Sequence, residues 1–182
     1  MTTFEIPTIE TKRLILREFQ EDRDFDAYAK FYATEQTKYY GGPLDRSLAW
    51  RAAAAMMGHW IMRGFGTWAV EEKATGDFCG MIGLWHPEGW PEREITWSIV
   101  PEKQGKGIAY EGALRARQYA YETLRWDAVF SCILDGNDAS IGLAEKLGAK
   151  LVRKERHPSR GTFLVYRHTT DETWDDQLID GR

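Results

Sequence analysis

Hydrophobic and polar positions along the chain change their period several times, and each change predicts a different kind of element. Apolar residues alternate with polar ones where a strand is expected, and they recur every three or four positions where a helix is expected. Acidic residues in a first turn and glycines after a last turn predict helix boundaries. In the first third of the chain these signals predict a strand over Arg13–Phe19, a helix over Asp22–Ala33, and a helix that Asp45 or Ser47 caps and Gly64 ends.

The pattern then shortens to the period of strands, with turn residues between them. The expected elements are a hairpin of Thr67–Glu71 and Phe78–Trp85, a strand over Glu94–Val100, a helix over Ala109–Leu124, a strand over Ala128–Leu134, a helix over Ala139–Leu147, and a closing antiparallel pair of Lys150–Glu155 and Thr162–Arg167. Strands and helices mixed in this order predict one α/β domain that spans residues 1–182.

Composition narrows the function classes. The formal net charge of -4 gives no global attraction to nucleic acid or to an anionic membrane, so neither is an expected partner. No apolar run has the length of a membrane span, and the N-terminus does not read as a signal peptide. Cys79 and Cys132 lie in apolar runs without metal-ligand spacing, so we expect buried thiols, no metal site and a cytoplasmic protein.

A glycine turn between an expected strand and an expected helix is the main candidate for chemistry. Gly105 and Gly107 flank Lys106, and the helix begins near Ile108. The first N–H groups of a helix have no partner within the helix, and with the helix dipole they form an anion site. Gln104 and Lys106 add donors, although two glycines alone are as typical of a plain tight turn.

Two well-known phosphate motifs do not fit this turn. A P-loop needs glycine where Val100 stands and serine or threonine where Gly107 stands. A dinucleotide fingerprint needs glycine where Tyr110 stands. Although neither motif fits, one nucleotide-binding function stays open: a protein that binds ATP at this turn without either motif.

The sequence motif Gln104-x-x-Gly107-x-Ala109 resembles the pyrophosphate loop of the GNAT acyl-CoA N-acyltransferases. The resemblance extends over residues 11–168 and favours the RimJ/RimL-like branch. The stretches that carry it are Thr11–Arg17, Glu94–Pro101, Asn137–Ser140 and Glu145–Ala149, and residues 169–182 would form an acidic tail beyond this core.

The resemblance implies the GNAT fold, a mostly antiparallel seven-stranded sheet with about four flanking helices. It implies that Glu94–Val100 splays from Ala128–Leu134 and that acetyl-CoA lies in the gap, with the pantetheine arm pairing like an extra strand. The cofactor-binding positions that it implies are Ile99, Val100, Gln104, Gly105, Lys106, Gly107, Ile108, Ala109, Tyr110, Asn137, Ser140 and Lys146.

The implied reaction is direct attack of a primary amine on the thioester in a ternary complex. Glu94 is the candidate base, with Glu92 a weaker one, and a backbone N–H near Val100 is the expected oxyanion donor. Many relatives carry a tyrosine seven residues after the asparagine, where this chain has Ala144, so Ser140 is the candidate acid.

The sequence does not decide the acceptor, which is a protein N-terminus or a small amine or amino acid. The oligomeric state, a homodimer included, also stays open. The missing tyrosine supports an alternative function, a non-catalytic acyl-CoA-binding sensor or interaction domain on the same fold.

Overall fold

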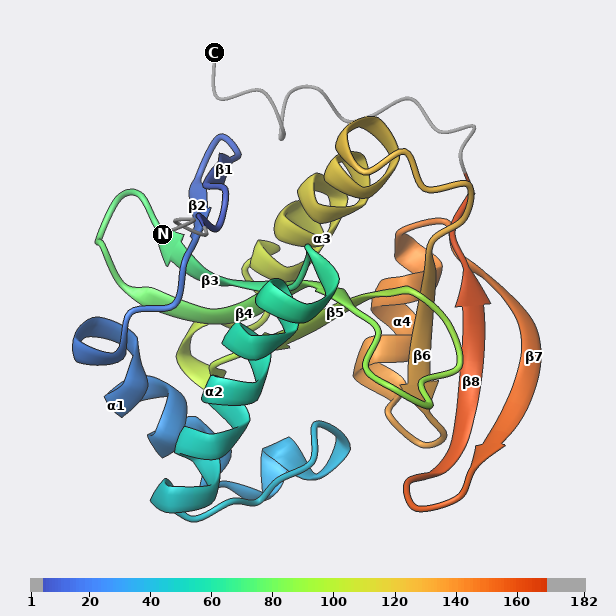
Figure 1. Ribbon diagram of the computed structural model, residues 1–182, viewed down its shortest axis with the longest axis horizontal. Helices are drawn as coiled ribbons and strands as arrows, with labels where there is room; N and C mark the ends of the chain where they lie inside the picture. The colour runs from blue at the N-terminus through green and yellow to red at the C-terminus, as the bar shows by residue number, and fades with distance from the viewer. Residues whose placement is uncertain (1–4, 170–182) are drawn as a thin grey trace.

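One sheet runs through residues 5–169, the part of the chain that the computed structural model describes (Figure 1). Its strands lie in the order β1-β2-β3-β4-β5-β6-β8-β7. They are β1 (Ile9–Glu10), β2 (Leu14–Arg17), β3 (Thr67–Glu72), β4 (Phe78–Trp85), β5 (Glu94–Ile99), β6 (Phe130–Leu134), β7 (Lys150–His157) and β8 (Gly161–Arg167). Neighbouring strands are antiparallel except β5 and β6, which are parallel. The expected mixed α/β fold with a mostly antiparallel sheet is confirmed.

The strand count differs from the expected seven because a short edge strand precedes the first predicted one. β1 has two residues, and Ile9 pairs with Leu16 of β2. A pair of residues is too short for an alternating pattern, so the sequence does not reveal it. In the middle of the sheet, β5 and β6 pair at Glu94 and Phe130, near the start of each strand. The splay of these two strands farther along stays a prediction.

Helices cover both faces of the sheet. They are α1 (Glu21–Tyr32), α2 (Arg46–Arg63), α3 (Ile108–Gln118) and α4 (Asp138–Lys146), with the short turns η1 (Glu35–Tyr39), η2 (Pro101–Lys103) and η3 (Tyr119–Thr123). Ala69 and Met81 are paired across β3 and β4 and belong to the core cluster of α1 and α2, which lie side by side in Figure 1. The next pair, Trp68 and Ile82, belongs to the cluster of α3. Strand alternation therefore sends neighbouring side chains to opposite helical layers.

Local capping explains where the helices begin and end. The Asp45 carboxylate accepts the Leu48 N–H at 2.8 Å, which selects the first of the two predicted caps for α2. Gly64 ends that helix with φ of 78°, as its position predicts. A side chain at Gly112 would place its Cβ 2.5 Å from the Ile82 side chain, so this glycine lets α3 approach β4 closely.

Within residues 5–169, no helix is long and apolar enough to cross a membrane. Both cysteines are buried and free, as expected. Of the predicted acidic tail, residues 170–182 lie outside the described residues.

Candidate active site

The turn between β5 and α3 exposes backbone at the start of a helix. Gly105 and Gly107 have φ of 71° and 78°, in the left-handed region that favours glycine. Gly107 is the N-cap of α3, so it offers no side chain to cap the first N–H groups, which begin at Ile108. The structure places the predicted turn at a helix N-terminus, and its role in anion binding stays a prediction.

Arg13, which directly precedes β2, supports this turn from the side. Its guanidinium donates to the Lys106 carbonyl at 3.0 Å and to the Glu111 carboxylate at 2.6 Å. Glu111 lies in the first turn of α3, is fully buried, and also accepts the Thr11 hydroxyl at 2.6 Å. No local sequence pattern marks Arg13 as a site residue, because its proximity to the turn depends on packing between segments 93 and 98 positions apart.

The backbone of β5 divides its hydrogen bonds between two neighbours. Val100, just after the strand, donates its N–H to the Cys79 carbonyl at 2.9 Å, so this group is engaged on the β4 side. The Ile99 carbonyl accepts the Gln104 side-chain amide at 2.7 Å, and the Ile95 carbonyl accepts the Ser131 hydroxyl of β6 at 3.1 Å. Alternate residues of a strand direct their N–H and C=O groups to opposite sides. The odd-numbered residues of β5 therefore direct their backbone groups toward β6.

Asn137 and Ser140 lie together at the start of α4. The Asn137 side chain accepts the Ser140 N–H at 3.3 Å and caps the helix, and the Ser140 hydroxyl accepts the Trp97 indole N–H at 3.3 Å. The Ser140 hydroxyl hydrogen is thus available for another acceptor. Lys146, near the other end of α4, lies 5.0 Å from the Tyr110 ring centroid, so these two predicted cofactor positions meet at a cation–π contact.

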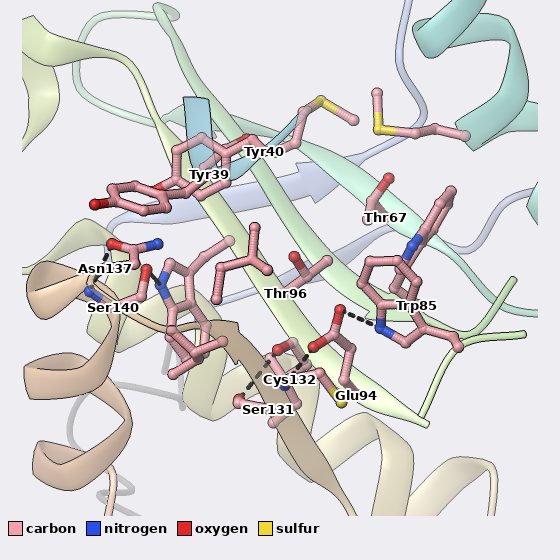
Figure 2. A pocket seen from close by; sticks show the side chains of 18 of the residues that line it. Tyr39, Tyr40, Thr67, Trp85, Glu94, Thr96, Ser131, Cys132, Asn137 and Ser140 are labelled. Carbon is pink, nitrogen blue, oxygen red and sulfur yellow. Dashed lines mark hydrogen bonds between the residues drawn. The ribbon is translucent and has the colours of Figure 1, made fainter. Parts of the chain in front are cut away.

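A cavity of about 290 Å³ lies on the α1–α2 face of the sheet, where β5 and β6 meet (Figure 2). Glu94, Thr96 and Ser98 of β5 line it, together with Asn137 and Ser140 of the α4 start. Its aromatic lining residues are Tyr28, Tyr32, Tyr39, Tyr40, Trp85, Trp90, Trp97 and Phe163. The structure therefore brings the predicted base, the asparagine and the predicted acid to one cavity. The glycine-turn positions from Gln104 to Tyr110, with Ile99, Val100 and Lys146, are not among its lining residues.

Glu94 is the carboxylate of this cavity, and it is 4% exposed. One oxygen accepts the backbone N–H of Cys132 at 2.6 Å, and the other accepts the Trp90 indole N–H at 2.9 Å. Burial raises the pKa of this carboxyl to about 8, although both donors favour the charged form and oppose the rise. A carboxyl group with a pKa in this range can take a proton from an ammonium group near neutral pH.

Trp90, which donates to Glu94, lies in a cluster of aromatic and cationic side chains. Phe163 lies 5.0 Å from the Trp90 ring centroid, and His157 lies 6.1 Å from it. The guanidinium of Arg160, in the turn between β7 and β8, lies 5.3 Å from the same ring. Arg160 and Phe163 both line the cavity, so the β7–β8 hairpin forms part of its wall.

Thr67, the first residue of β3, adds a polar group to the cavity wall. Figure 2 shows it beside Trp85 on the far side of the pocket from Asn137. Its hydroxyl is buried and has no hydrogen-bond partner among the described residues. A buried hydroxyl without a partner is costly, and a polar group of a bound molecule would satisfy it.

Two tyrosines from the connection between α1 and α2 reach the start of α4. The Tyr39 hydroxyl donates to the Gly136 carbonyl at 2.7 Å. Burial raises the pKa of Tyr40, while its hydrogen bonds with the Ser140 and Asn137 side chains act in the opposite direction. Figure 2 shows both tyrosines close to Asn137. Only the tertiary fold brings the α1–α2 connection to the turn after β6, and with it these two phenols to the start of α4.

Ala144, where many relatives were expected to have tyrosine, is fully buried in the core cluster of α3. It is not among the lining residues of the cavity. Tyr40 instead brings a phenol to Asn137 and Ser140 from another part of the chain.

Other titratable groups near the sheet have structural partners. Glu92, the weaker base candidate, pairs with Arg153 at 3.0 Å and is not among the lining residues. His168 is buried, and burial together with the nearby Arg117 lowers its pKa to about 3, so its ring is neutral. Since the Ser131 hydroxyl donates to Ile95, it accepts from the imidazole at 3.0 Å. This pair holds β6 against β5.

No group of three or more histidine, cysteine or acidic residues within residues 5–169 is arranged to hold a metal ion. The expectation that the protein needs no metal therefore stays an expectation.

Comparison with known proteins points to one family. The family model described as an acetyltransferase (GNAT) domain matches residues 13–150. YoaA of Bacillus subtilis (strain 168), an N-acetyltransferase by name, is 31% identical over 150 residues, which cover 78% of this chain and 82% of the relative.

Solved structures agree in fold. An acetyltransferase from Agrobacterium tumefaciens superimposes with a TM-score of 0.83 at 31% identity and covers 93% of this chain and 98% of its own. Mycobacterium smegmatis RimJ, solved in complex with CoA-disulfide, has a TM-score of 0.68 at 15% identity, with 91% of this chain and 88% of its own covered. At that identity the likeness is one of fold alone.

Proposed function

This chain belongs to the GNAT acetyltransferase family, and on that premise we propose that it transfers the acetyl group of acetyl-CoA to a primary amine. The amine attacks the thioester carbonyl directly while both substrates are bound. A new C–N bond forms, the C–S bond breaks, and CoA leaves as a thiol. The acceptor is a small amine or amino acid, or a protein N-terminus.

The observation that carries the proposal is the carboxyl group of Glu94 in the cavity wall. An amine is protonated near neutral pH and cannot attack until it loses a proton. Glu94 is held by the Cys132 N–H and the Trp90 indole, so its position is set before any substrate binds. We assign it the role of general base, acting on the amine directly or through one water.

The departing thiolate needs a proton, and the hydroxyl of Ser140 is our candidate donor. Its oxygen accepts from Trp97, which leaves its hydrogen free to point at the cavity. The phenol of Tyr40 interacts with the same hydroxyl and is a second donor at the same place. Both hydroxyl groups line the cavity at the start of α4, so either is in a position to supply this proton.

In this proposal, backbone N–H groups make most of the contacts to CoA, and charged side chains make few. The diphosphate lies on the N–H groups that begin at Gly105 and continue into the first turn of α3, and Arg13, paired with Glu111, holds the turn in shape through the Lys106 carbonyl. Lys146, beside Tyr110, is a candidate for the ribose phosphate. Mycobacterium smegmatis RimJ, a structure of similar fold, was solved in complex with CoA-disulfide, which supports CoA as the acyl carrier.

The pantetheine arm pairs with the backbone of β5 on the side that faces β6. Since Val100 already donates its N–H to Cys79, the N–H of Ile99 is the better candidate for the oxyanion of the tetrahedral intermediate. Asn137, which caps α4 and lines the cavity, is our candidate to bond the amide groups of the arm.

An acceptor screen that measures free CoA thiol tests the proposal. Acetyl-CoA is incubated with amines, amino acids and short peptides, and the Glu94→Gln variant serves as the matched control. Thiol release with at least one amine class, and its loss in the variant, is the expected result. Tight binding of CoA without turnover on any acceptor would instead indicate the non-catalytic acyl-CoA binder.

A further inference from the structure

We propose that Arg160 selects acceptor amines that also carry a carboxylate, so that the acceptor is of amino-acid type with an apolar body. This inference deepens the proposed function and rests on it. It starts from the charges of the cavity wall. Among the described lining residues, Glu94 is the carboxylate and Arg160 is the guanidinium, and both contact Trp90.

Trp90 connects the two charged groups. Its indole N–H donates to the Glu94 carboxylate at 2.9 Å, and its ring lies 5.3 Å from the Arg160 guanidinium carbon. Phe163 packs on the same ring at 5.0 Å. A guanidinium that lies over an indole keeps its edge donors free for an anion.

Arg160 has no carboxylate partner of its own among the described residues, whereas Arg17, Arg46 and Arg153 form ion pairs at 2.7–3.0 Å. A guanidinium presents its donors in a planar fork that matches a carboxylate. A Cβ built at Gly41 would lie 3.5 Å from one guanidinium nitrogen, so the side chain also lies against the α1–α2 connection. Arg160 is thus flanked by that connection and by Trp90 at the cavity wall.

The two charged groups meet the same indole, Glu94 at its N–H and Arg160 at its ring, so both border the space that one small molecule would fill. Burial dominates the pKa of Glu94 and raises it, but the Arg160 charge reaches the carboxyl and lowers that pKa. An acceptor with its amine at Glu94 and its carboxylate at Arg160 would place its remaining atoms against the aromatic lining. The buried Thr67 hydroxyl offers one further hydrogen bond to such a molecule.

A guanidinium at the acceptor site distinguishes free amino acids from protein N-termini. A protein N-terminus has a peptide bond where a free amino acid has its carboxylate, so it gives Arg160 no charge to bind unless a side chain supplies one. A free amino acid or an aromatic amino acid analogue provides both groups. We therefore assign the acceptor site to small amine carboxylates rather than to peptide ends.

The test compares matched acceptors that differ only in the carboxylate. The probes are phenylalanine against phenylalaninamide, and 4-(aminomethyl)benzoate against 4-(aminomethyl)benzamide, which cover two spacings between amine and anion. The quantity measured is the ratio of kcat/KM for acid and amide within each pair. Comparing that ratio between wild type and Arg160→Gln cancels the different basicity of the two amines.

We expect Arg160→Gln to lower the acid-to-amide ratio about tenfold for at least one pair, which is the usual weight of a hydrogen bond to a charged group. Arg160→Lys should keep part of the preference. Arg160 and Arg156 are both exposed, but only Arg160 lines the cavity, so Arg156→Gln removes the same charge from the same hairpin and should leave the ratio unchanged. CoA affinity should be equal in all four proteins.

Three results would overturn the proposal. One is an unchanged ratio in Arg160→Gln, and another is an equal change in Arg156→Gln. The third is a wild-type enzyme that acetylates neutral amines or peptide N-termini but no carboxylate-bearing amine. An enzyme that acetylates no amine at all would show that the proposed function itself is wrong.

Discussion

The Glu94 carboxylate accepts the backbone N–H of Cys132 at 2.6 Å, so a side chain of β5 takes a hydrogen bond from the backbone of β6. The same carboxylate faces the cavity and the Trp90 indole. One residue thus joins the two central strands and provides the ionisable group of the site. Its protonation should therefore affect both activity and stability.

Glu94→Gln should lower kcat by a factor of about 10²–10⁴, the usual weight of a general base. In the wild type, kcat/KM should rise with pH through an inflection near the Glu94 pKa of about 8, because the base is active only when ionised. The measurement should use an acceptor whose amine is already neutral at about pH 7. The substrate then does not titrate near pH 8, so an inflection there belongs to the enzyme. A wild-type profile without that inflection, or a variant with full turnover, would remove Glu94 from this role.

The same group predicts a pH dependence of folding. The folded-state pKa of Glu94 is raised from its ordinary 4.5 to about 8, so the folded protein holds a proton that the unfolded chain releases. The contribution of Glu94 to the free energy of unfolding is fully present below about pH 4.5 and is lost as pH rises through 8. Urea unfolding of wild type and Glu94→Gln across this range measures it.

Because all other groups titrate in both proteins, the difference in unfolding free energy between wild type and Glu94→Gln isolates this carboxyl. We expect the wild type to lose stability relative to the variant as pH increases. A difference that does not change with pH would contradict the raised pKa. Gln also brings an amide donor toward Trp90 or Cys132, but that cost is independent of pH.

The glycine turn can be tested with two nearly isosteric substitutions at one position. Gly105 has φ of 71°, which asparagine and aspartate tolerate better than other residues, and a Cβ there would meet nothing within 4 Å. If the turn binds the CoA diphosphate, Gly105→Asp should weaken CoA binding about tenfold or more through like-charge repulsion, while Gly105→Asn should stay close to wild type.

Isothermal titration with CoA measures the effect, and thermal melting checks that the two variants are equally stable. Equal CoA affinity for Gly105→Asp and Gly105→Asn would contradict the assignment of the diphosphate to this turn.

The proton donor can be assigned with Ser140→Ala and Tyr40→Phe. Each removes one hydroxyl hydrogen from the start of α4 and leaves Asn137 in place as the helix cap. We expect Ser140→Ala to lower kcat about tenfold or more with little change in the KM for acetyl-CoA. If Ser140 and Tyr40 act as one unit, the double variant should lose little more than the larger single effect.

Steady-state kinetics of the three proteins beside wild type measure these losses. Full turnover in the double variant would exclude a proton donor at this place, and strictly additive losses would show that the two hydroxyl groups act independently.

Much of the fold could be predicted from the sequence because its signals are local. The alternating strands, the Asp45 cap and the Gly64 stop each depend on a few neighbouring residues, and the structure confirms them. The two-residue β1 was missed because it is shorter than any period that can be detected. Of the candidate site, Glu94, Asn137 and Ser140 were predicted from motifs, and the structure places all three at one cavity.

What the sequence by itself determined is therefore the order of elements, the glycine turn at the start of α3 and the carboxyl group at the start of β5. Only the tertiary structure decided which other groups meet them. The Tyr39 hydroxyl reaches a carbonyl 97 positions away, and Arg160 reaches the indole of Trp90 from another hairpin. Turn chemistry and hydrophobic period act between near neighbours in the chain, whereas burial, pKa and the walls of a cavity arise from packing between distant segments.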